Sequence, residues 1–169
     1  MIASPTLVIG PVDIERRIER LAYQILEENY AEHTIWLAGI AGQGSQLAHR
    51  ICQHLRRIAP FAVVDFTVLV DKKATTQPAI MLDRVKAADM EGGVVVLVDD
   101  VLNTGKTLMY ALAPFTQMAL KRLQLVVLVE RGHRAYPISA TFAGIALSTT
   151  IEDHIHVWLE GEGTGVWLH

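Results

Sequence analysis

The stretch that decides the fold is Val94–Thr107, which reads VVVLVDDVLNTGKT. Its first five residues, Val94–Val98, are all aliphatic, which is typical of a strand buried on both faces. Two adjacent carboxylates, Asp99 and Asp100, follow the strand, and a short turn leads into Thr104 at the start of a helix. Because ligands of open parallel sheets bind outside the carboxyl ends of the strands, we expect a binding site at this turn.

The residues of the turn suit the binding of a phosphate group. Gly105 lets the backbone approach an anion closely, and the first amides of the helix direct unpaired N–H groups toward it. Thr104 and Thr107 add hydroxyl donors, while Lys106 adds a positive charge. The two aspartates before the turn suit the vicinal hydroxyls of a sugar, because a carboxylate accepts two hydrogen bonds at once. The pattern therefore predicts a cradle for a phosphate next to a site for a sugar.

Two other interpretations compete for the same stretch. A Walker loop also contains Gly-Lys-Thr, but it needs another glycine five residues before the Gly-Lys pair, where this chain has Asp100. A nucleotide hydrolase is therefore disfavoured. The second alternative is a plain helix N-cap with two solvated aspartates. It is also disfavoured, because paired acids at the end of so apolar a strand require an explanation.

Hydrophobic patterns on both sides of this stretch predict alternating helices and strands. A helix that begins near residue 12 and ends around residues 29–33 carries one apolar stripe, formed by Ile14, Ile18, Leu21 and Ile25. Beyond it we expect strands at 35–40, 61–70 and 124–129, helices at 45–57 and from 104 to about 118 (shortened or kinked by Pro114), and short peripheral strands at 141–143 and 156–159. Residues 72–90 have no strong periodicity, which is typical of a mobile functional loop.

The length and composition indicate one α/β domain spanning residues 1–169. Strands that alternate with helices predict three layers, with a mostly parallel sheet of about five strands flanked by helices. A net charge of −3 argues against binding nucleic acid through bulk charge, and no apolar run is long enough for a membrane span. The single cysteine, Cys52, lies in an apolar helical pattern, so we expect it to be buried in a protein of the reducing cytoplasm.

The segment VVLVDDVLNTGKT resembles the phosphoribosyl-pyrophosphate signature of type I phosphoribosyltransferases. More closely, the chain resembles the pyrimidine-operon attenuators that double as uracil phosphoribosyltransferases. That likeness extends over most of the chain, from IERRIERLAYQILEEN (Ile14–Asn29) through LVERGHR (Leu128–Arg134) to Pro137-Ile138. The resemblance implies a type I phosphoribosyltransferase fold with a small hood beside the central sheet. It also implies Mg²⁺-dependent transfer of a phosphoribosyl group to a pyrimidine base, with release of pyrophosphate.

The resemblance further implies a role for each matching position. The ribose hydroxyls of phosphoribosyl pyrophosphate would be bound by the catalytic acids Asp99 and Asp100. Its 5′-phosphate would be held by Thr104, Gly105, Lys106 and Thr107. Its pyrophosphate would lie at Gly39–Gly44, with the loop itself formed by Ala41, Gly42, Gln43 and Gly44. A flexible loop at 72–89 would close over the site with Lys72 and Lys73. The nucleobase, or a nucleoside monophosphate, would lie beside Glu130, Arg131, Gly132, His133 and Arg134. Mg²⁺ would be held mainly by the substrate.

Two positions differ from the pattern of these relatives. Gln43 stands where relatives carry a Lys or Arg before the second glycine of the pyrophosphate loop, and Val70 stands where they carry an arginine before an aspartate. Both cations would neutralise the leaving pyrophosphate. The alternative function is therefore a nucleotide-sensing regulator with little or no turnover, with or without binding to RNA. Asn103 replaces the acid of many purine-specific members, so a purine is expected less than uracil.

Other clusters have plainer interpretations. A basic group on one helix is formed by His49, Arg50, His54, Arg56 and Arg57, and we favour a solvated face over an RNA-binding one. His133 is a candidate proton carrier, although a structural histidine explains it equally well. His154 and His156 have no thiol nearby, so no zinc site is expected. Trp158 and Trp167 are expected to pack at an edge or subunit contact, and the resemblance implies a homodimer.

Overall fold

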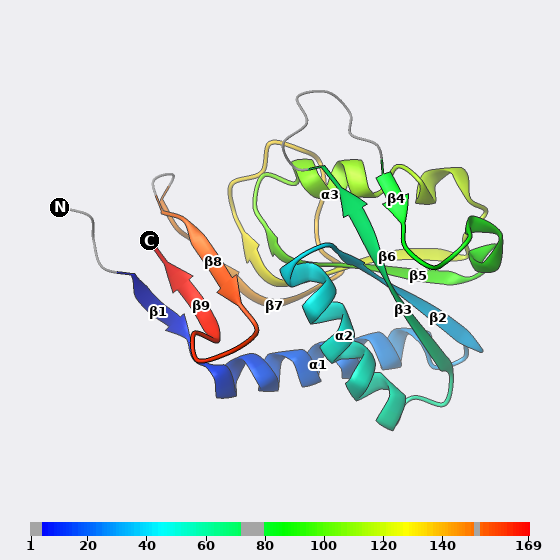
Figure 1. Cartoon of the computed structure of the whole chain (residues 1–169), viewed down its shortest axis with the longest axis horizontal. Coiled ribbons are helices and arrows are strands. Elements are labelled where there is room, and N and C mark those ends of the chain that lie inside the picture. Colours follow the sequence, from blue (N-terminus) through cyan, green and yellow to red (C-terminus); the bar gives the residue numbers. More distant parts are fainter. Residues whose placement is uncertain (1–4, 72–79, 151–152) are drawn as a thin grey trace.

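The computed structural model describes residues 5–71, 80–150 and 153–169, which form two sheets with helices packed against the larger one (Figure 1). The larger sheet has the strand order β4-β3-β2-β5-β6-β7. Five of its strands run parallel: β2 (Thr34–Ile40), β3 (Ala62–Val70), β5 (Val94–Leu102), β6 (Arg122–Arg131) and β7 (Phe142–Leu147). The short strand β4 (Ile80–Leu82) pairs antiparallel with β3 at one edge. The α/β fold with a mostly parallel central sheet is therefore confirmed.

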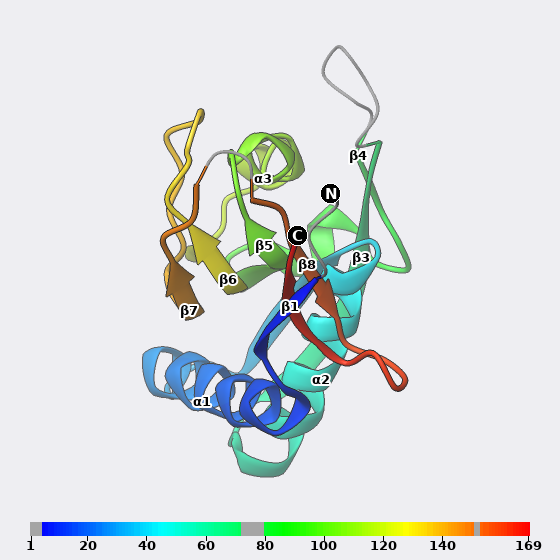
Figure 2. The same ribbon diagram turned by 90° about the vertical axis from the view of Figure 1, so that its left-hand side faces the viewer.

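Helices cover both faces of this sheet (Figures 1 and 2). One face packs on α1 (Pro11–Asn29) and α2 (Gln43–Ile58), and the other on α3 (Lys106–Ala111) with the 3₁₀ turns η1 (Ala87–Met90) and η2 (Phe115–Gln117). Strand β5 lies between β2 and β6 and contributes to both cores, since Val96 faces α1 and α2 while Val95 and Leu97 face α3. All three side chains are fully buried. This two-sided burial explains the uninterrupted aliphatic run.

Helix α1 forms where the apolar periodicity predicts it. Pro11 occupies its first turn, where a missing N–H costs nothing. The apolar stripe is fully buried in the core between the helix and the sheet, and consists of Ile14, Ile18, Leu21 and Ile25. Among the residues that the structure describes, none of the helices combines the length and hydropathy needed to cross a membrane.

A second, three-stranded antiparallel sheet lies beside the start of α1, in the order β1-β9-β8 (Figure 2). Its strands are β1 (Thr6–Ile9), β8 (Ile155–Trp158) and β9 (Gly165–Leu168), and we call this sheet the hood. Only the strand near 156–159 was expected. Strands β1 and β9 were not expected, because they form by pairing with each other across distant parts of the sequence.

Several boundaries differ from the sequence-based expectations. Helix α2 begins at Gln43, so two residues of the predicted pyrophosphate loop lie in its first turn. Helix α3 begins only at Lys106 and ends at Ala111, three residues before Pro114, which confirms that the proline shortens it. Strand β5 continues beyond Val98 to Leu102, because it remains paired with β6 along its whole length. The strand expected at 141–143 extends to Leu147, because it pairs with β6 at the edge of the larger sheet.

Candidate functional site

The two adjacent acids lie within the last part of β5, at the carboxyl edge of the sheet. Asp99 is 3% exposed, and its Oδ1 accepts a hydrogen bond from the backbone N–H of Asp100 at 3.0 Å. Asp100 is only partly buried. Gly44 packs directly against Asp99, because a Cβ added at Gly44 would lie 2.8 Å from the same Oδ1 atom. The acids are therefore held by the strand itself and by the start of α2, rather than by a loose turn.

The loop between β5 and α3 has a backbone that only glycine adopts easily at one position. Gly105 has a φ of 85°, in the left-handed region, and an added Cβ would collide with Cγ2 of Ile138. The backbone N–H of Lys106 donates to Oγ1 of Thr104 at 3.3 Å. The carbonyl of Thr104 in turn accepts from the N–H groups of Ala135 and Tyr136, at 3.0 and 3.1 Å. Residues 135–138 thus hold the loop in place through hydrogen bonds to Thr104 and packing against Gly105.

A pocket of about 110 Å³ lies at this loop and is lined by Asp99, Asp100, Val101, Asn103, Thr104, Gly105, Lys106, Thr107 and Leu108. The fold brings both carboxylates and the four residues of the expected phosphate cradle to this one pocket. Carboxylate acceptors therefore stand beside hydroxyl donors, backbone amides and an ammonium group. This arrangement can accept hydrogen bonds from a diol and donate them to a phosphate within one small space.

A larger pocket of about 410 Å³ adjoins the first and shares Asn103 and Thr104 with it. Its other lining residues are Arg131, His133, Arg134, Ala135 and His154. Three residues expected beside the nucleobase therefore line the neighbouring pocket. Glu130 lies near the end of strand β6 and forms an ion pair with Arg134. This ion pair balances part of the positive charge of Arg134.

Arg131 organises the wall of this second pocket. The side chain is 4% exposed, and all three guanidinium nitrogens donate to protein acceptors. Nε bonds Oγ1 of Thr149 at 2.6 Å, Nη2 bonds the carbonyl of Thr150 at 2.5 Å, and Nη1 bonds Oδ1 of Asn103 at 3.3 Å. Arg131 therefore ties the loop after β5 to the loop after β7. Sequence reasoning missed both threonines, because nothing local links residues 149–150 to residue 131.

His133 takes part in the same connection. Its Nε2 lies 2.6 Å from the carbonyl oxygen of Thr149, and because a carbonyl only accepts, Nε2 donates this bond. The contact supports the structural interpretation of His133. Nearby, hydrogen bonds from the side chain and backbone of Thr150 lower the pKa of Asp153 below its ordinary value. Hydrogen bonds thus hold Thr149, Thr150 and Asp153 in place after β7.

The predicted pyrophosphate loop follows β2 and is very short. Gly42 has a φ of 99°, which strongly favours glycine, and α2 begins at the next residue. Oε1 of Gln43 accepts a hydrogen bond from the backbone N–H of Leu159 at 3.0 Å, at the end of hood strand β8. Gln43, which stands in place of the Lys or Arg of the family pattern, therefore ties the loop to the hood. The packing of Gly44 on Asp99 brings this loop next to the acids.

A mostly apolar hollow of about 290 Å³ adjoins this loop at Ala41 and is also lined by Leu69, Val70, Asp71 and Met81. None of these described lining residues carries a positive charge. Lys72 and Lys73, which were expected to act from the flexible loop, lie outside the described residues. The rest of that predicted segment is structured in part, since Ile80–Leu82 forms β4 and Ala87–Met90 forms η1.

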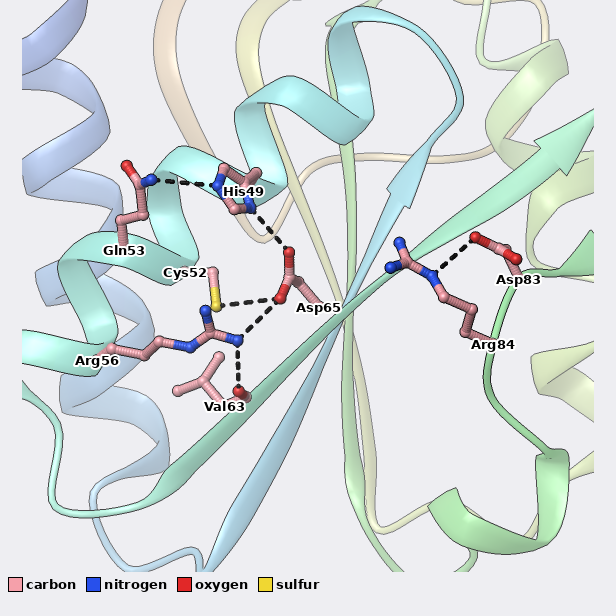
Figure 3. Close-up of polar contacts among 8 residues, drawn as sticks. All are labelled: His49, Cys52, Gln53, Arg56, Val63, Asp65, Asp83 and Arg84. Atoms are coloured by element: carbon pink, nitrogen blue, oxygen red, sulfur yellow. Dashed lines mark hydrogen bonds and ion pairs between the residues drawn. The ribbon is translucent and has the colours of Figure 1, made fainter.

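The basic face of α2 is largely neutralised by acids from neighbouring elements. Arg56 and His49 contact the two carboxylate oxygens of Asp65 on β3, at 3.0 and 3.1 Å, and Cys52 donates to the same carboxylate at 3.6 Å (Figure 3). The remaining basic residues on this helix form a chain of contacts through Glu15 on α1, which involves Arg50, His54 and Arg57. These pairs support the solvated interpretation of this face.

Burial controls the chemistry of Cys52. Burial, reinforced by the negative charge of Asp65, raises the pKa of the Cys52 thiol to about 12. Burial alone would also raise the pKa of Asp65, but hydrogen bonds from His49 and Cys52 and the charge of Arg56 lower it below its ordinary value. The expected burial of the cysteine is confirmed, and the thiol is a poor nucleophile because it stays protonated near neutral pH.

Sequence comparison finds a family match and similar curated proteins. Residues 12–159 match the model of the phosphoribosyl transferase domain family. The bifunctional protein PyrR of a Roseiflexus species is 38% identical over 165 residues, which cover 94% of this chain and 90% of that protein. The bifunctional protein PyrR of Staphylococcus aureus is 34% identical over 167 residues, which cover 93% of each.

Solved structures of the same fold are more distant in sequence. A hypoxanthine-guanine phosphoribosyltransferase from Bacillus anthracis has a TM-score of 0.76 at 16% identity, covering 96% of this chain and 95% of that one. A hypoxanthine phosphoribosyltransferase from Trypanosoma cruzi has a TM-score of 0.76 at 19% identity, covering 95% and 92%. At these identities the likeness demonstrates the shared fold alone.

Proposed function

The chain belongs to the type I phosphoribosyltransferase family, and from this premise we propose that it transfers the phosphoribosyl group of phosphoribosyl pyrophosphate to uracil. The observation that carries the proposal is the pocket at residues 99–108, where two carboxylates and a phosphate cradle meet. The similarity to proteins named bifunctional PyrR supports a pyrimidine base as the acceptor.

In the proposed complex, Asp99 and Asp100 accept hydrogen bonds from the ribose hydroxyls. The 5′-phosphate receives hydrogen bonds from the hydroxyls of Thr104 and Thr107 and from the backbone amides that follow Gly105. Because Gly105 has no side chain, the phosphate can approach the backbone closely. These contacts fix the sugar ring relative to the base, and correct orientation alone supplies a large part of the rate in bimolecular reactions.

Mg²⁺ is the metal that the family implies. Two carboxylates at the rim of the pocket are hard oxygen donors of the kind that Mg²⁺ accepts, so the residues fit such an ion. In the proposal, Asp99 and Asp100 lie beside the ion, whereas the substrate supplies most of its oxygens. When bound, Mg²⁺ would neutralise negative charge on the leaving pyrophosphate.

The reaction is a displacement at the anomeric carbon. A ring nitrogen of uracil forms a bond to that carbon, the bond from the carbon to the pyrophosphate oxygen breaks, and the electron pair leaves with pyrophosphate. The proton of the ring nitrogen is released to solvent or to pyrophosphate. No protein nucleophile is needed, so the protein acts by positioning groups, stabilising charge and excluding water.

The neighbouring pocket supports a pyrimidine acceptor. Asn103 lies between the two pockets and has no group that titrates near neutral pH, so it cannot manage a proton on the base. Its Oδ1 accepts from buried Arg131, which fixes the orientation of the amide. The amide N–H groups of Asn103 are donors suited to a carbonyl oxygen of uracil.

A second candidate is a nucleotide-sensing regulator with little turnover. Gln43 and Val70 favour it, because neither supplies the positive charge that a departing pyrophosphate requires, and one lost stabilising group costs about a hundredfold in rate. This candidate uses the same pocket and predicts binding of a nucleoside monophosphate without release of pyrophosphate.

The first experiment is to measure pyrophosphate release from phosphoribosyl pyrophosphate and Mg²⁺ over a panel of nucleobases. We expect release with uracil and none with purines, and the Asp99→Asn/Asp100→Asn variant serves as the inactive control. Release with a purine alone would contradict the choice of base. No release by folded protein that still binds uridine monophosphate would instead support the regulator.

A further inference from the structure

The outer face of the hood carries an aromatic surface that the proposed function does not use. Residues paired across the strands point to the same side, and the register pairs Trp167 with both Leu7 and His156. These side chains alternate with inward-facing Val157 and Val166, which are buried in the core. Trp167 and its neighbours therefore lie on the side of the hood that faces away from the larger sheet.

A pocket of about 480 Å³ opens on this face and is lined by Pro5, Trp158, Glu160, Gly163, Trp167 and His169. Gly165 lies opposite Trp158 in the sheet, and the side chains of Leu7 and Trp167 lie over it. Larger residues do not fit at Gly165, because an added Cβ would lie 2.9 Å from Nε1 of Trp167. The pocket shares no lining residue with the two pockets beside Asp99.

The walls of this pocket are fixed in place before any ligand arrives. Nε1 of Trp167 donates to the carbonyl of Gly163 at 3.0 Å, which sets the plane of that indole. The ring of His169 packs edge-on against His156, with centroids 4.7 Å apart. Trp158, in contrast, is 52% exposed, which is unusual for so large an apolar side chain. Burying its face would therefore contribute favourably to binding.

The charge around the pocket is negative. Glu160 belongs to the lining and is exposed, and Glu162 lies exposed in the same turn between β8 and β9. Within the described part of the chain, no ion pair occupies the carboxylate of Glu160, and the lining includes no lysine or arginine. Indole faces attract cations through their quadrupole, and a nearby carboxylate adds to that attraction.

From these features we propose that the hood pocket is a binding site for a small organic cation of the alkylammonium class. The cation lies against the indoles of Trp158 and Trp167, with its charge toward Glu160. This site goes beyond the proposed transfer reaction, which requires no cationic organic ligand. Its volume of about 480 Å³ lies in the range of small-molecule pockets, about 300–1,000 Å³, and leaves room for a ligand as small as choline.

The test is a titration of the full chain with choline chloride, against sodium chloride at matched ionic strength. Binding is followed by calorimetry and by tryptophan fluorescence, since two of the three tryptophans line the pocket. We expect saturable binding with a dissociation constant of about 1 mM. Dimethylbutanol, the uncharged isostere of choline, should bind at least about tenfold more weakly, because it lacks the charge that the indoles and Glu160 attract.

Variants distinguish binding in this pocket from nonspecific binding of choline to exposed aromatic residues. Trp158→Leu should weaken choline binding by about tenfold and Glu160→Gln by about threefold. Both side chains are exposed, so these variants should fold normally. Tyr30→Leu removes an exposed aromatic residue at the other end of α1 and should change nothing.

Three outcomes would overturn the proposal: no saturable binding of choline, equal affinity for dimethylbutanol, or unchanged affinity in both pocket variants. A fourth would reassign the surface to contact between copies of the chain. That outcome is self-association in sedimentation experiments that Trp158→Leu abolishes, with choline failing to bind the dissociated protein.

Discussion

The loops after β5 and β2 use the same backbone device with different side chains. Each follows a parallel strand, turns at a glycine with positive φ, and begins a helix at the next residue. After Gly105 come Lys106 and Thr107, which face the pocket beside Asp99. After Gly42 comes Gln43, whose side chain accepts a hydrogen bond from the hood. The backbone geometry offers a place for an anion, but the side chains decide whether its charge is balanced.

The two glycines also differ in their surroundings. Gly105 packs against Ile138 of the supporting segment, whereas an added Cβ at Gly42 would meet nothing within 4 Å. The loop after β5 is therefore enclosed and fixed, while the loop after β2 is open on its outer side. We therefore predict that the loop after β5 determines the affinity for phosphoribosyl pyrophosphate, and that the loop after β2 determines the rate of pyrophosphate release.

The largest effect should come from the acids that adjoin the first loop. Asp99→Asn with Asp100→Asn should weaken the binding of phosphoribosyl pyrophosphate and of uridine monophosphate by about a thousandfold, because hydrogen bonds to charged acceptors contribute about 1.5–3 kcal/mol each. Calorimetric titration measures this change. Gln43→Ala, in the second loop, is the matched control and should weaken binding by less than about tenfold. Unchanged affinity in the double variant would remove the site assignment.

Alanine substitutions at Gly105 and Gly42 should distinguish two contributions to the free energy of unfolding: the collision with Ile138 and the strain of a positive φ. Gly105→Ala should destabilise the fold by about 3 kcal/mol, because left-handed strain adds to a collision with Ile138. In the double variant with Ile138→Ala, the loss of stability should be about 1–2 kcal/mol smaller than the sum of the two single effects. Gly42→Ala should cost about 1–3 kcal/mol from strain alone. Urea unfolding gives all three values, and additive effects of Gly105→Ala and Ile138→Ala would show that enclosure contributes nothing.

Restoring charge to the second loop should increase turnover. Gln43→Arg with Val70→Arg should raise pyrophosphate release with uracil by about tenfold, because both guanidinium groups can stabilise the leaving group. Steady-state release of pyrophosphate is the measurement. Gln43→Ala with Val70→Ala removes the same side chains without adding charge, and it should give no gain. If the arginine variant also gives none, missing cations do not limit the reaction.

The smallest effect should come from a cluster that belongs to neither loop. Asp65→Asn should destabilise the fold by about 1 kcal/mol at pH 7, because Asp65 pairs with Arg56 and His49. The folded pKa of Asp65 is lowered, so its stabilisation is present above about pH 4 and is lost as the pH falls through the folded pKa.

Urea unfolding from pH 3 to pH 7 checks this prediction, and the difference between variant and parent should decrease toward the acid end. Asp83→Asn removes the exposed ion pair between Asp83 and Arg84 and should cost less than about 0.5 kcal/mol (Figure 3). A pH-independent loss for Asp65→Asn would mean that packing, rather than charge, accounts for its role. Ligand binding should be unaffected by either variant.

The central layer of the fold could be predicted because its signals are local. The aliphatic run Val94–Val98 and the apolar stripe of α1 each specify burial within a few neighbouring residues. The strands β1 and β9 could not, because their pairing joins distant parts of the sequence. Strand β4 was missed for a similar reason, since its three residues are ordered by pairing with β3.

The candidate site shows the same division. The pocket at residues 99–108 is formed by consecutive residues, so its composition was readable from the sequence. The roles of Gln43 and Arg131 were not, because their partners come from elsewhere in the chain. Gln43 meets Leu159 of the hood, and Arg131 meets Thr149 beyond β7. Each contact depends on how layers come together, which no local pattern encodes.

The pairing of β1 with β9 has a consequence for the order of folding. Closing a loop of roughly 160 residues in an otherwise unfolded chain costs about 4–5 kcal/mol of entropy, which a few hydrogen bonds between four-residue strands cannot offset. Once the larger sheet and α1 have formed, only short segments remain to be ordered. We therefore expect the hood to be the last part of the molecule to fold and the first to open. The amides of Val166 and Leu168 should then exchange their hydrogens with solvent much faster than those of Val95 and Leu97.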